Sequence, residues 1–250
     1  MDIKNLPPSG FKPPIRNRFG SAEKKNSFVN SLFDKTAKHY DRACAVGFLG
    51  TGNLYRKRML EEAGLAPDDN VIDVACGTGA VTRQIAKILQ QGQGRIVAVD
   101  PSRGMLDQAR SLAEVEFHQG HAEALPVESK TFDFLSMGYA LRHVDDLTQT
   151  FQEFRRVLKP GGTALILEVS TPQTQWGFRL ARAYFGHIAP TSTWITTGSS
   201  DAREMMRYYW ETIEACVPPE EVISSLQNSG FQEVERKVEL GVFSAYRAKA

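Results

Sequence analysis

The sequence predicts one α/β domain built on a Rossmann-like, seven-stranded and mostly parallel sheet, with an antiparallel C-terminal strand pair and a helical cap. Three observations lead to this fold. Short apolar runs alternate with helical patterns over residues 70–169, which is typical of a parallel sheet covered by helices. A glycine-rich turn directly follows the first apolar run. An aromatic-rich helical stretch over 170–214 is too long for an ordinary crossover and indicates an inserted cap.

Length and composition limit the class of protein. The chain has 250 residues and is 42% hydrophobic, which is sufficient for one large core. Its 30 Lys and Arg residues nearly balance its 29 Asp and Glu residues, so we expect no nucleic-acid partner. The cysteines are scattered and lack C-x-x-C spacing, which predicts neither a disulfide framework nor a zinc site and fits a reducing compartment.

No stretch of the sequence is typical of a secretory signal or a membrane span. The N-terminal residues lack an apolar core, and no run approaches the ~20 apolar residues that cross a bilayer. We therefore expect a cytoplasmic protein without a transmembrane segment. Peripheral membrane contact through a surface helix and a homodimer formed through the cap both stay open.

The N-terminal region precedes the sheet. Residues 1–26 combine proline pairs with basic side chains and predict a flexible basic arm, either a solvated tail or a lid. One domain is expected over residues 27–250. Apolar residues at helical spacing predict helices over 27–40 and 53–63. The cap is expected to comprise residues 27–66 and 170–214.

From residue 70 on, strands and helices alternate in the pattern of a parallel sheet. Strands are expected over 71–75, 95–100, 115–119, 132–137 and 163–169, with helices ending near Leu89 and covering 102–112 and 147–158. Right-handed crossovers place the C-terminal ends of these strands along one edge, where ligands bind in such sheets. Beyond the cap, Pro218-Pro219 opens a helix, and strands over 231–238 and 241–248 are close enough in sequence to form an antiparallel pair.

The turn after the first strand is the candidate cofactor site. Gly77 and Gly79 let the backbone approach a ligand closely, and the helix N-terminus beyond them favours a carboxylate or phosphate. Asp100 ends the second strand about 20 residues on, where a carboxylate accepts hydrogen bonds from ribose hydroxyls. A nicotinamide dinucleotide is the rival ligand, but its fingerprint has Gly or Ala where this chain has Thr82. The turn over Lys159–Gly162 before the fifth strand then favours S-adenosylmethionine.

Several blocks carry a family resemblance. Residues 33–41 read F-D-x-x-A-x-x-Y-D, and residues 140–143 read A-L-R-H. The other blocks are Asp73–Gly79, Asp100–Ser102 with Met105-Leu106, Ala122–Pro126, Arg156–Gly162, Leu167–Ser170, Glu211–Ile213 and Ser229–Phe231. In these blocks, over about residues 30–248, the chain resembles the ubiquinone/menaquinone biosynthesis C-methyltransferase family of class I methyltransferases.

The resemblance implies a cofactor and its binding residues. The cofactor is S-adenosylmethionine, and the product is S-adenosylhomocysteine. Carried over position by position, the resemblance assigns cofactor binding to Asp73, Ala75, Gly77, Thr78, Gly79, Asp100, Ser102, Met105, His121, Ala122, Glu123 and Met137. His121 departs from the family, which has aspartate or asparagine just before the alanine.

The chemistry requires an activated nucleophile. An aromatic carbon or phenol oxygen attacks a methyl group well only once the phenol is deprotonated, so a base or a stabilising cation is expected. The resemblance points to the arginine of the L-R-N block, here Arg142. Because arginine is always protonated, we expect it to stabilise the phenolate, while His143, which replaces the usual asparagine, titrates near neutrality and takes the proton.

Substrate contacts are expected from aromatic side chains and one acid. They are Tyr40, Tyr139, Glu168, Tyr184 and Tyr209. The other histidines, His39, His118 and His187, show no metal-ligand spacing, so no metal is expected.

Three functions follow from these features. The first is C-methylation of a hydroxylated aromatic or quinol-type substrate, with or without a prenyl tail. The second is O- or N-methylation of a small aromatic secondary metabolite, which the departures at Cys44, His121 and His143 favour. The third is a non-catalytic cofactor-binding subunit of a biosynthetic complex. An intact glycine turn predicts cofactor binding both in such a subunit and in an enzyme.

Overall fold

The computed structural model describes residues 22–47, 52–172 and 174–250, whose strands form one sheet of order β3-β2-β1-β4-β5-β7-β6. The strands from β3 to β5 pair in parallel, and β7 runs antiparallel to both β5 and β6. Their bounds are β1 Val71–Val74, β2 Ile96–Asp100, β3 Val115–Gln119, β4 Phe132–Gly138, β5 Leu158–Val169, β6 Gln232–Glu239 and β7 Phe243–Lys249. The predicted sheet and its antiparallel C-terminal pair are confirmed.

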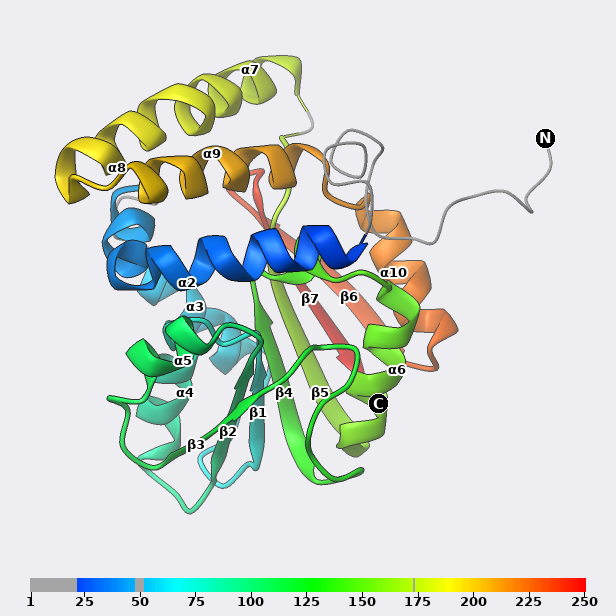
Figure 1. Cartoon of the computed structure of the whole chain (residues 1–250). Coiled ribbons are helices and arrows are strands. Elements are labelled where there is room, and N and C mark those ends of the chain that lie inside the picture. Colours follow the sequence, from blue (N-terminus) through cyan, green and yellow to red (C-terminus); the bar gives the residue numbers. More distant parts are fainter. Residues whose placement is uncertain (1–21, 48–51, 173) are drawn as a thin grey trace.

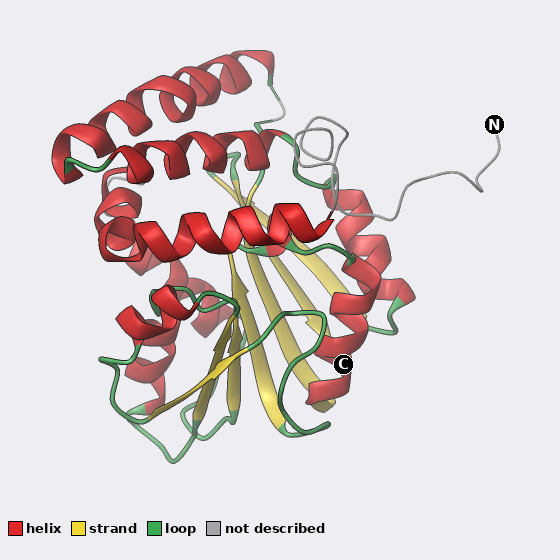
Figure 2. Ribbon diagram, viewed as in Figure 1, coloured by secondary structure: helices red, strands yellow, loops and turns green. Residues whose placement is uncertain are grey.

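Helices cover both faces of this sheet (Figures 1 and 2). One face carries α3 Gly52–Glu62, α4 Thr82–Leu89 and α5 Arg103–Ala109, and the other carries α6 Leu147–Val157 and α10 Pro219–Asn228. Ile85 of α4 packs against the first face, and Phe151 and Phe154 of α6 pack against the second. β1 and β2 are buried at every position, which explains why they read as continuous apolar runs.

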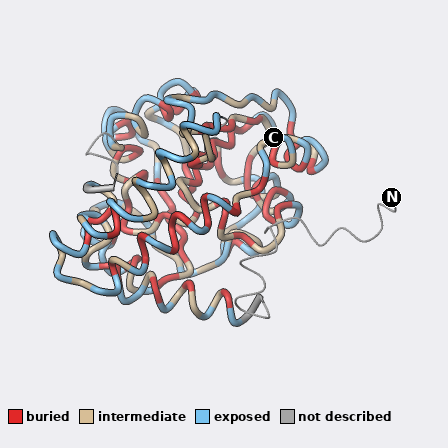
Figure 3. Tube along the Cα trace, turned by 90° about the horizontal axis from the view of Figure 1, so that it is seen from above, coloured by how far each residue is buried: buried red, intermediate tan, exposed pale blue. Residues whose placement is uncertain are grey.

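A cap of helices lies above the C-terminal ends of the strands (Figure 1). It consists of α2 Ala22–Gly47, α7 Gln175–Ala183, the π-helical turn η3 Tyr184–Ile188, α8 Ala189–Thr197 and α9 Ser200–Glu214. Helix α2 crosses the molecule beneath the others and packs against α5, α8 and α9. Seen from above, buried positions concentrate in the interior and exposed ones along the outer helices (Figure 3).

Two boundaries differ from the sequence-based expectation. Helix α2 begins at Ala22 rather than at residue 27, and Lys25 in its first turn forms an ion pair of 2.6 Å with Asp145. Helix α3 was assigned to the cap but packs against the sheet, since its buried Met59 and Leu60 join the same core cluster as Ile85. The predicted basic arm lies outside the described residues except for its last turn, which is helical.

β5 also begins earlier than expected. Leu158 already pairs with Phe132, and the register then shifts before Thr163 pairs with Phe134. Gly161, with φ +78°, sits in this irregular stretch, where the left-handed backbone favours glycine. Within the described helices, none is both long and apolar enough to cross a membrane.

Candidate functional site

A cavity of about 90 Å³ lies at the C-terminal ends of β1, β2 and β4, below α2. It brings together residues that the sequence predicted for different tasks. The predicted cofactor residues that line it are Ala75, Gly77, Asp100, Ser102 and Met105, and the predicted substrate and catalytic residues are Tyr40, Tyr139, Arg142 and His143. One edge of the sheet therefore carries both sets.

Asp100 holds the glycine turn at the edge of the cavity. Its Oδ2 accepts a hydrogen bond from the Gly77 backbone N at 2.7 Å, and its Oδ1 accepts one from the Ser102 backbone N at 2.8 Å. Each oxygen keeps a further lone pair for a ligand hydroxyl. Burial raises the pKa of Asp100 to about 6.

Gly77 leaves room for a ligand beside this carboxylate. Its φ is +57°, and a Cβ placed on it would meet no heavy atom within 4 Å. The open space next to a ribose-type acceptor fits the nucleoside part of S-adenosylmethionine. Gly79, with φ +85°, is confined instead, because a Cβ there would lie 2.8 Å from Leu112 Cδ1.

Asp73 supports the glycine turn from within the core. Its side chain is fully buried and accepts hydrogen bonds from Thr82 Oγ1 and Ser136 Oγ, both at 2.6 Å. Burial raises the pKa of Asp73 to about 6. Thr82, which occupies the third position of the dinucleotide fingerprint, thus ties the first turn of α4 to β1.

Arg142 is buried beside the cavity and fully engaged by its neighbours. It follows β4 and is 1% exposed. Its Nη1 donates to Glu168 Oε1 at 2.5 Å, and its Nε donates to Thr212 Oγ1 at 3.0 Å. Its guanidinium carbon lies 4.0 Å from the centroid of the Tyr209 ring. Burial by itself lowers the pKa of Arg142, but the nearby Glu168 carboxylate contributes to a net rise above the usual value, so the guanidinium stays charged.

His143 stands in an aromatic box. Its ring is stacked on Tyr208, with centroids 5.7 Å apart, and meets the edge of Phe33 at 5.6 Å. Neither ring nitrogen has a hydrogen-bond partner in the described part of the chain. Burial, followed by the charges of Arg142 and Lys25, lowers the pKa of His143 well below its usual value. The expectation of a histidine that titrates near neutrality was therefore wrong, because burial beside a fixed cation keeps this imidazole neutral.

Two aspartates clamp α2 onto the cofactor loops, and no role was expected for them. Asp34 Oδ1 accepts a hydrogen bond from Ser102 Oγ at 2.6 Å. Asp41 accepts one from Thr78 Oγ1 at 2.5 Å and pairs with Arg83 Nη2 at 2.9 Å. The sequence did hold a signal, because residues seven apart lie on one helix face and the opening block spaces its two aspartates by seven.

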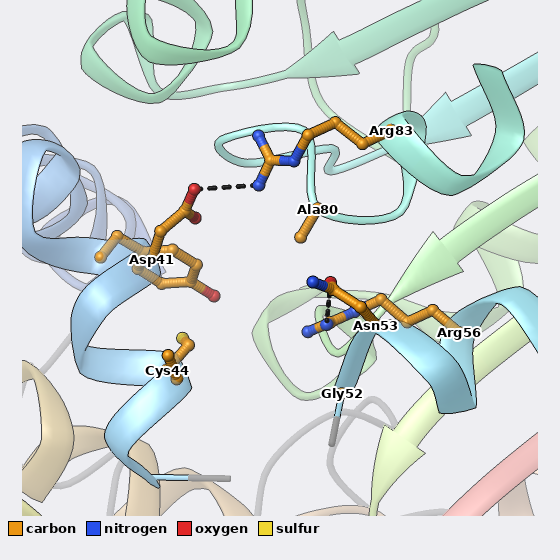
Figure 4. A pocket seen from close by; sticks show the side chains of 9 residues that line it. Asp41, Cys44, Gly52, Asn53, Arg56, Ala80 and Arg83 are labelled. Atoms are coloured by element: carbon orange, nitrogen blue, oxygen red, sulfur yellow. Dashed lines mark hydrogen bonds and ion pairs between the residues drawn. The ribbon is translucent and has the colours of Figure 1, made fainter. Parts of the chain in front are cut away.

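A second cavity, of about 270 Å³, opens between α2 and α3 and shares Tyr40 with the first. Figure 4 shows Arg56 and Asn53 from α3 and Cys44 from α2 around this space. The Arg56 guanidinium carbon lies 5.2 Å from the centroid of the Tyr139 ring, and within the described ranges its Nε has no hydrogen-bond partner. No motif marks Arg56 in the sequence, since its place depends on the packing of α3.

Part of the predicted cofactor set lies outside the lining of the first cavity. Met137 is fully buried in the core, and Thr78 turns its hydroxyl to α2. His121 is exposed, and Glu123 Oε1 accepts the backbone N–H of Asp145 at 2.8 Å. The residues not brought to the lining are Asp73, Thr78, Gly79, His121, Ala122, Glu123 and Met137.

Three predicted substrate residues are also engaged elsewhere. The carboxylate oxygens of Glu168 accept hydrogen bonds from Arg142 and from the Val169 backbone N, which lies 2.8 Å away. Tyr209 faces the Arg142 guanidinium, and Tyr184 packs against Phe185 with centroids 5.0 Å apart. In this structure Glu168 and Tyr209 hold Arg142, and Tyr184 packs within the cap. In the ranges that the structure describes, no three His, Cys, Asp or Glu side chains form a metal-binding group.

Comparisons with known proteins agree with this geometry. A family model described as the ubiE/COQ5 methyltransferase family matches residues 20–249. The chain is 29% identical over 238 residues to a demethylmenaquinone methyltransferase from Symbiobacterium thermophilum, covering 90% of this chain and 91% of that protein. It is 32% identical over 235 residues to a ubiquinone/menaquinone biosynthesis C-methyltransferase from Campylobacter jejuni, covering 90% and 98%.

Solved structures share the fold. A SAM-dependent methyltransferase from Aquifex aeolicus superposes with a TM-score of 0.56 at 20% identity, covering 78% of this chain and 88% of that one. A phosphoethanolamine N-methyltransferase from Haemonchus contortus, solved with S-adenosylhomocysteine, gives a TM-score of 0.60 at 16% identity, covering 86% and 57%. At such identities the likeness extends to the fold alone.

Proposed function

Because the chain belongs to the ubiE/COQ5 family of S-adenosylmethionine-dependent methyltransferases, we propose that it methylates a ring carbon of a hydroxylated aromatic or quinol-type substrate. The names of its relatives support a prenylated quinol such as demethylmenaquinol. One observation carries the proposal: a single cavity joins the glycine turn to Arg142 and His143. A buried cation and a neutral imidazole beside the cofactor suit a phenol that must give up its proton.

The cofactor residues have separate tasks in this proposal. Asp100 accepts hydrogen bonds from the ribose hydroxyls. Gly77 has no side chain, so the ligand can lie close to the backbone there. Asp73 shapes the turn without touching the ligand. Arg56, which borders the adjoining cavity with an unpartnered Nε in the described chain, is the cation proposed for the methionine carboxylate. S-adenosylmethionine, when bound, supplies the methyl group from its sulfonium centre.

Arg142 is proposed to stabilise the phenolate form of the substrate. A fixed guanidinium in a site with little water lowers the free energy of a neighbouring oxyanion, because it needs no reorganisation when the charge forms. Glu168 and Thr212 are positioning residues that hold its Nη1 and Nε, so that the guanidinium is fixed at the edge of the cavity.

His143 is proposed to accept the proton that the phenol releases. Its lone pair is available, since neither ring nitrogen has a partner in the described residues. The lowered pKa makes it a weak base, so most of the driving force must come from the phenolate stabilisation by Arg142. After the methyl group is attached, the ring carbon loses its hydrogen as a proton to solvent, and His143 returns its proton to the ring oxygen, so the aromatic phenol is restored.

The test is methyl transfer to a demethylmenaquinol with a short prenyl chain, kept reduced, from cofactor labelled with ¹³C in the methyl group. We expect the label on a ring carbon, located by NMR and fragment masses. A label on oxygen would establish the O-methyltransferase alternative instead. Binding of S-adenosylhomocysteine without turnover on any quinol or polyphenol would support the non-catalytic subunit.

The same assay separates a proton acceptor from a packing residue at position 143. His143→Phe preserves the aromatic box and removes both nitrogens, so we expect kcat to fall about a hundredfold, the usual scale for a general base. The melting temperature and the Kd for S-adenosylhomocysteine should stay unchanged. His118→Phe, a substitution at a half-exposed histidine on β3, is the matched control and should leave kcat unaltered.

Cofactor binding is expected to weaken in acid. The ribose hydroxyls are held by the carboxylate form of Asp100, whose pKa burial raises to about 6. Below that pH the acid is protonated before the ligand binds, so the Kd for S-adenosylhomocysteine should rise about tenfold per pH unit. Titration calorimetry at pH 5, 6 and 7.5 measures this. Asp100→Asn should flatten the dependence, whereas an unchanged slope in that variant would assign it to Asp73.

A further inference from the structure

The outer side of the α7–α8 arm, residues 175–197, exposes large apolar side chains. Trp176 is 72% exposed and Ile195 is 71% exposed, and Leu180 and Ile188 between them are also exposed. Trp194 is exposed too, but its ring lies 5.7 Å from the Arg203 guanidinium carbon of α9. The other large exposed hydrophobic side chains of the described chain are scattered, at Leu54, Val238 and Leu240. Single exposed apolar side chains are ordinary, but a contiguous group marks an interaction surface.

The π-helical turn keeps these side chains on one side. Helix α7 passes through η3 into α8 without a break, and the Ala189 backbone N–H bonds to the Tyr184 carbonyl, five residues back. The wider turn absorbs one extra residue, so Trp176, Leu180 and Ile188 stay on the solvent side of the arm. In Figure 1 α7 forms the outermost layer of the cap, with α9 between it and α2, whereas α8 also packs against α2.

The inner side of the arm is already occupied. Phe178 and Phe185 pack against Trp210 of α9, with centroids 5.9 Å and 6.0 Å apart. The arm is thus held to the protein by one apolar side and presents a second to solvent.

The charged side chains of the arm are all positive. Residues 169–200 contain no Asp, Glu or Lys, and their charged side chains are Arg179 and Arg182, with His187 titratable beside them. Both arginines are exposed, and in the described part of the chain neither has an acidic partner at ion-pair distance. The first acids beyond the arm, Asp201 and Glu204, belong to α9.

We propose that the α7–α8 arm docks on an anionic phospholipid bilayer. Tryptophan and aliphatic side chains beside arginines are the composition of helices that lie in the membrane interface, with apolar groups below the headgroups and guanidinium groups on lipid phosphates. A face meant for a second copy of the chain would pair its arginines with acids, and the arm supplies none. That such docking delivers a prenylated substrate rests on the proposed function, whereas bilayer binding itself does not.

The experiment is co-sedimentation of the full chain with vesicles of phosphatidylglycerol and phosphatidylcholine in equal parts, without cofactor or substrate. We expect binding that weakens with salt and is at least tenfold weaker to pure phosphatidylcholine. Trp176→Ser with Leu180→Ser should reduce binding at least tenfold. Arg179→Gln with Arg182→Gln should reduce it on the anionic vesicles by roughly fivefold per arginine and remove the salt dependence.

The matched control is Leu54→Ser with Leu240→Ser, which removes exposed apolar side chains elsewhere and should leave binding unchanged. Far-UV circular dichroism and the Kd for S-adenosylhomocysteine show that every variant is folded. Equal loss in the control, or binding that ignores Trp176 and Leu180, overturns the proposal. So does a stable dimer without lipid that the Trp176 and Leu180 variant dissociates, since the arm is then an interface between copies. Vesicle binding by a chain that methylates no quinol would refute the proposed function and leave the docking proposal standing.

Discussion

Replacing Arg142 by methionine is expected to lower the free energy of unfolding by about 3–5 kcal/mol, the scale for breaking one side of a buried ion pair. Methionine fills much of the same volume but leaves the Glu168 carboxylate, 2% exposed, without its cation. Chemical denaturation at pH 7.5 measures the loss. The same variant should show no detectable quinol methylation, because the charge proposed to hold the phenolate is gone.

The matched variant is the double change Arg142→Met with Glu168→Gln. Removing both charges should restore most of the lost stability, since no isolated buried charge remains. Activity should not return, which separates the structural from the catalytic consequence of losing Arg142. A single variant that loses less than about 1 kcal/mol would show that water reaches Glu168 in solution, and the pair would then behave like a surface ion pair.

Replacing Asp100 by alanine is expected to weaken S-adenosylhomocysteine binding more than a hundredfold. A hydrogen bond to a charged group contributes about 1.5–3 kcal/mol, and a ribose presents two hydroxyls to this carboxylate. The variant also frees the backbone N–H of Gly77, which Asp100 now orients at 2.7 Å. Titration calorimetry of the wild type and the variant gives the ratio of Kd values.

Asp133→Ala is the control for this prediction. Asp133 lies near the start of β4, at the opposite end of the strand from the cavity, and pairs with Lys159 at 2.8 Å. Its removal should leave the Kd unchanged. NADH should bind neither protein measurably. Retained binding in Asp100→Ala would mean that the ribose is held elsewhere, and tight NADH binding would reopen the nicotinamide alternative.

The order of helices and strands along the chain could be predicted because each element has a local sequence pattern. β1 and β2 are buried on both sides and therefore apolar throughout, while α6 shows its core face as apolar residues at helical spacing. The family, its cofactor and its enzyme class followed from short blocks and are confirmed by the family match. The arrangement of the cap, its boundary at residue 27 and the role of each site residue carried no such local pattern.

The site shows where local information ends. Asp73 and Asp100 both end or occupy strands at the cofactor edge, yet one faces Thr82 and Ser136 while the other lines the cavity. Neighbouring side chains of a strand point to opposite faces of the sheet. Which groups each side chain contacts there depends on how helices α4 and α5 pack. The Asp34 clamp could have been anticipated from the seven-residue spacing, although its partner Ser102 could not.

By itself, the sequence determined a mostly parallel Rossmann-like sheet with an antiparallel C-terminal pair, the glycine turn with Asp100 behind it, and the nomination of Arg142. Those features depend on residues close in the chain, whose spacing reports their geometry. Only the tertiary structure decided that Arg142 is paired with Glu168, that His143 is neutral in a box of Phe33 and Tyr208, and that Glu168 is withdrawn from the cavity. These outcomes join residues 26 to 110 positions apart in the chain, from Arg142 with Glu168 to Phe33 with His143, and burial sets the charge of each group only once those segments have packed.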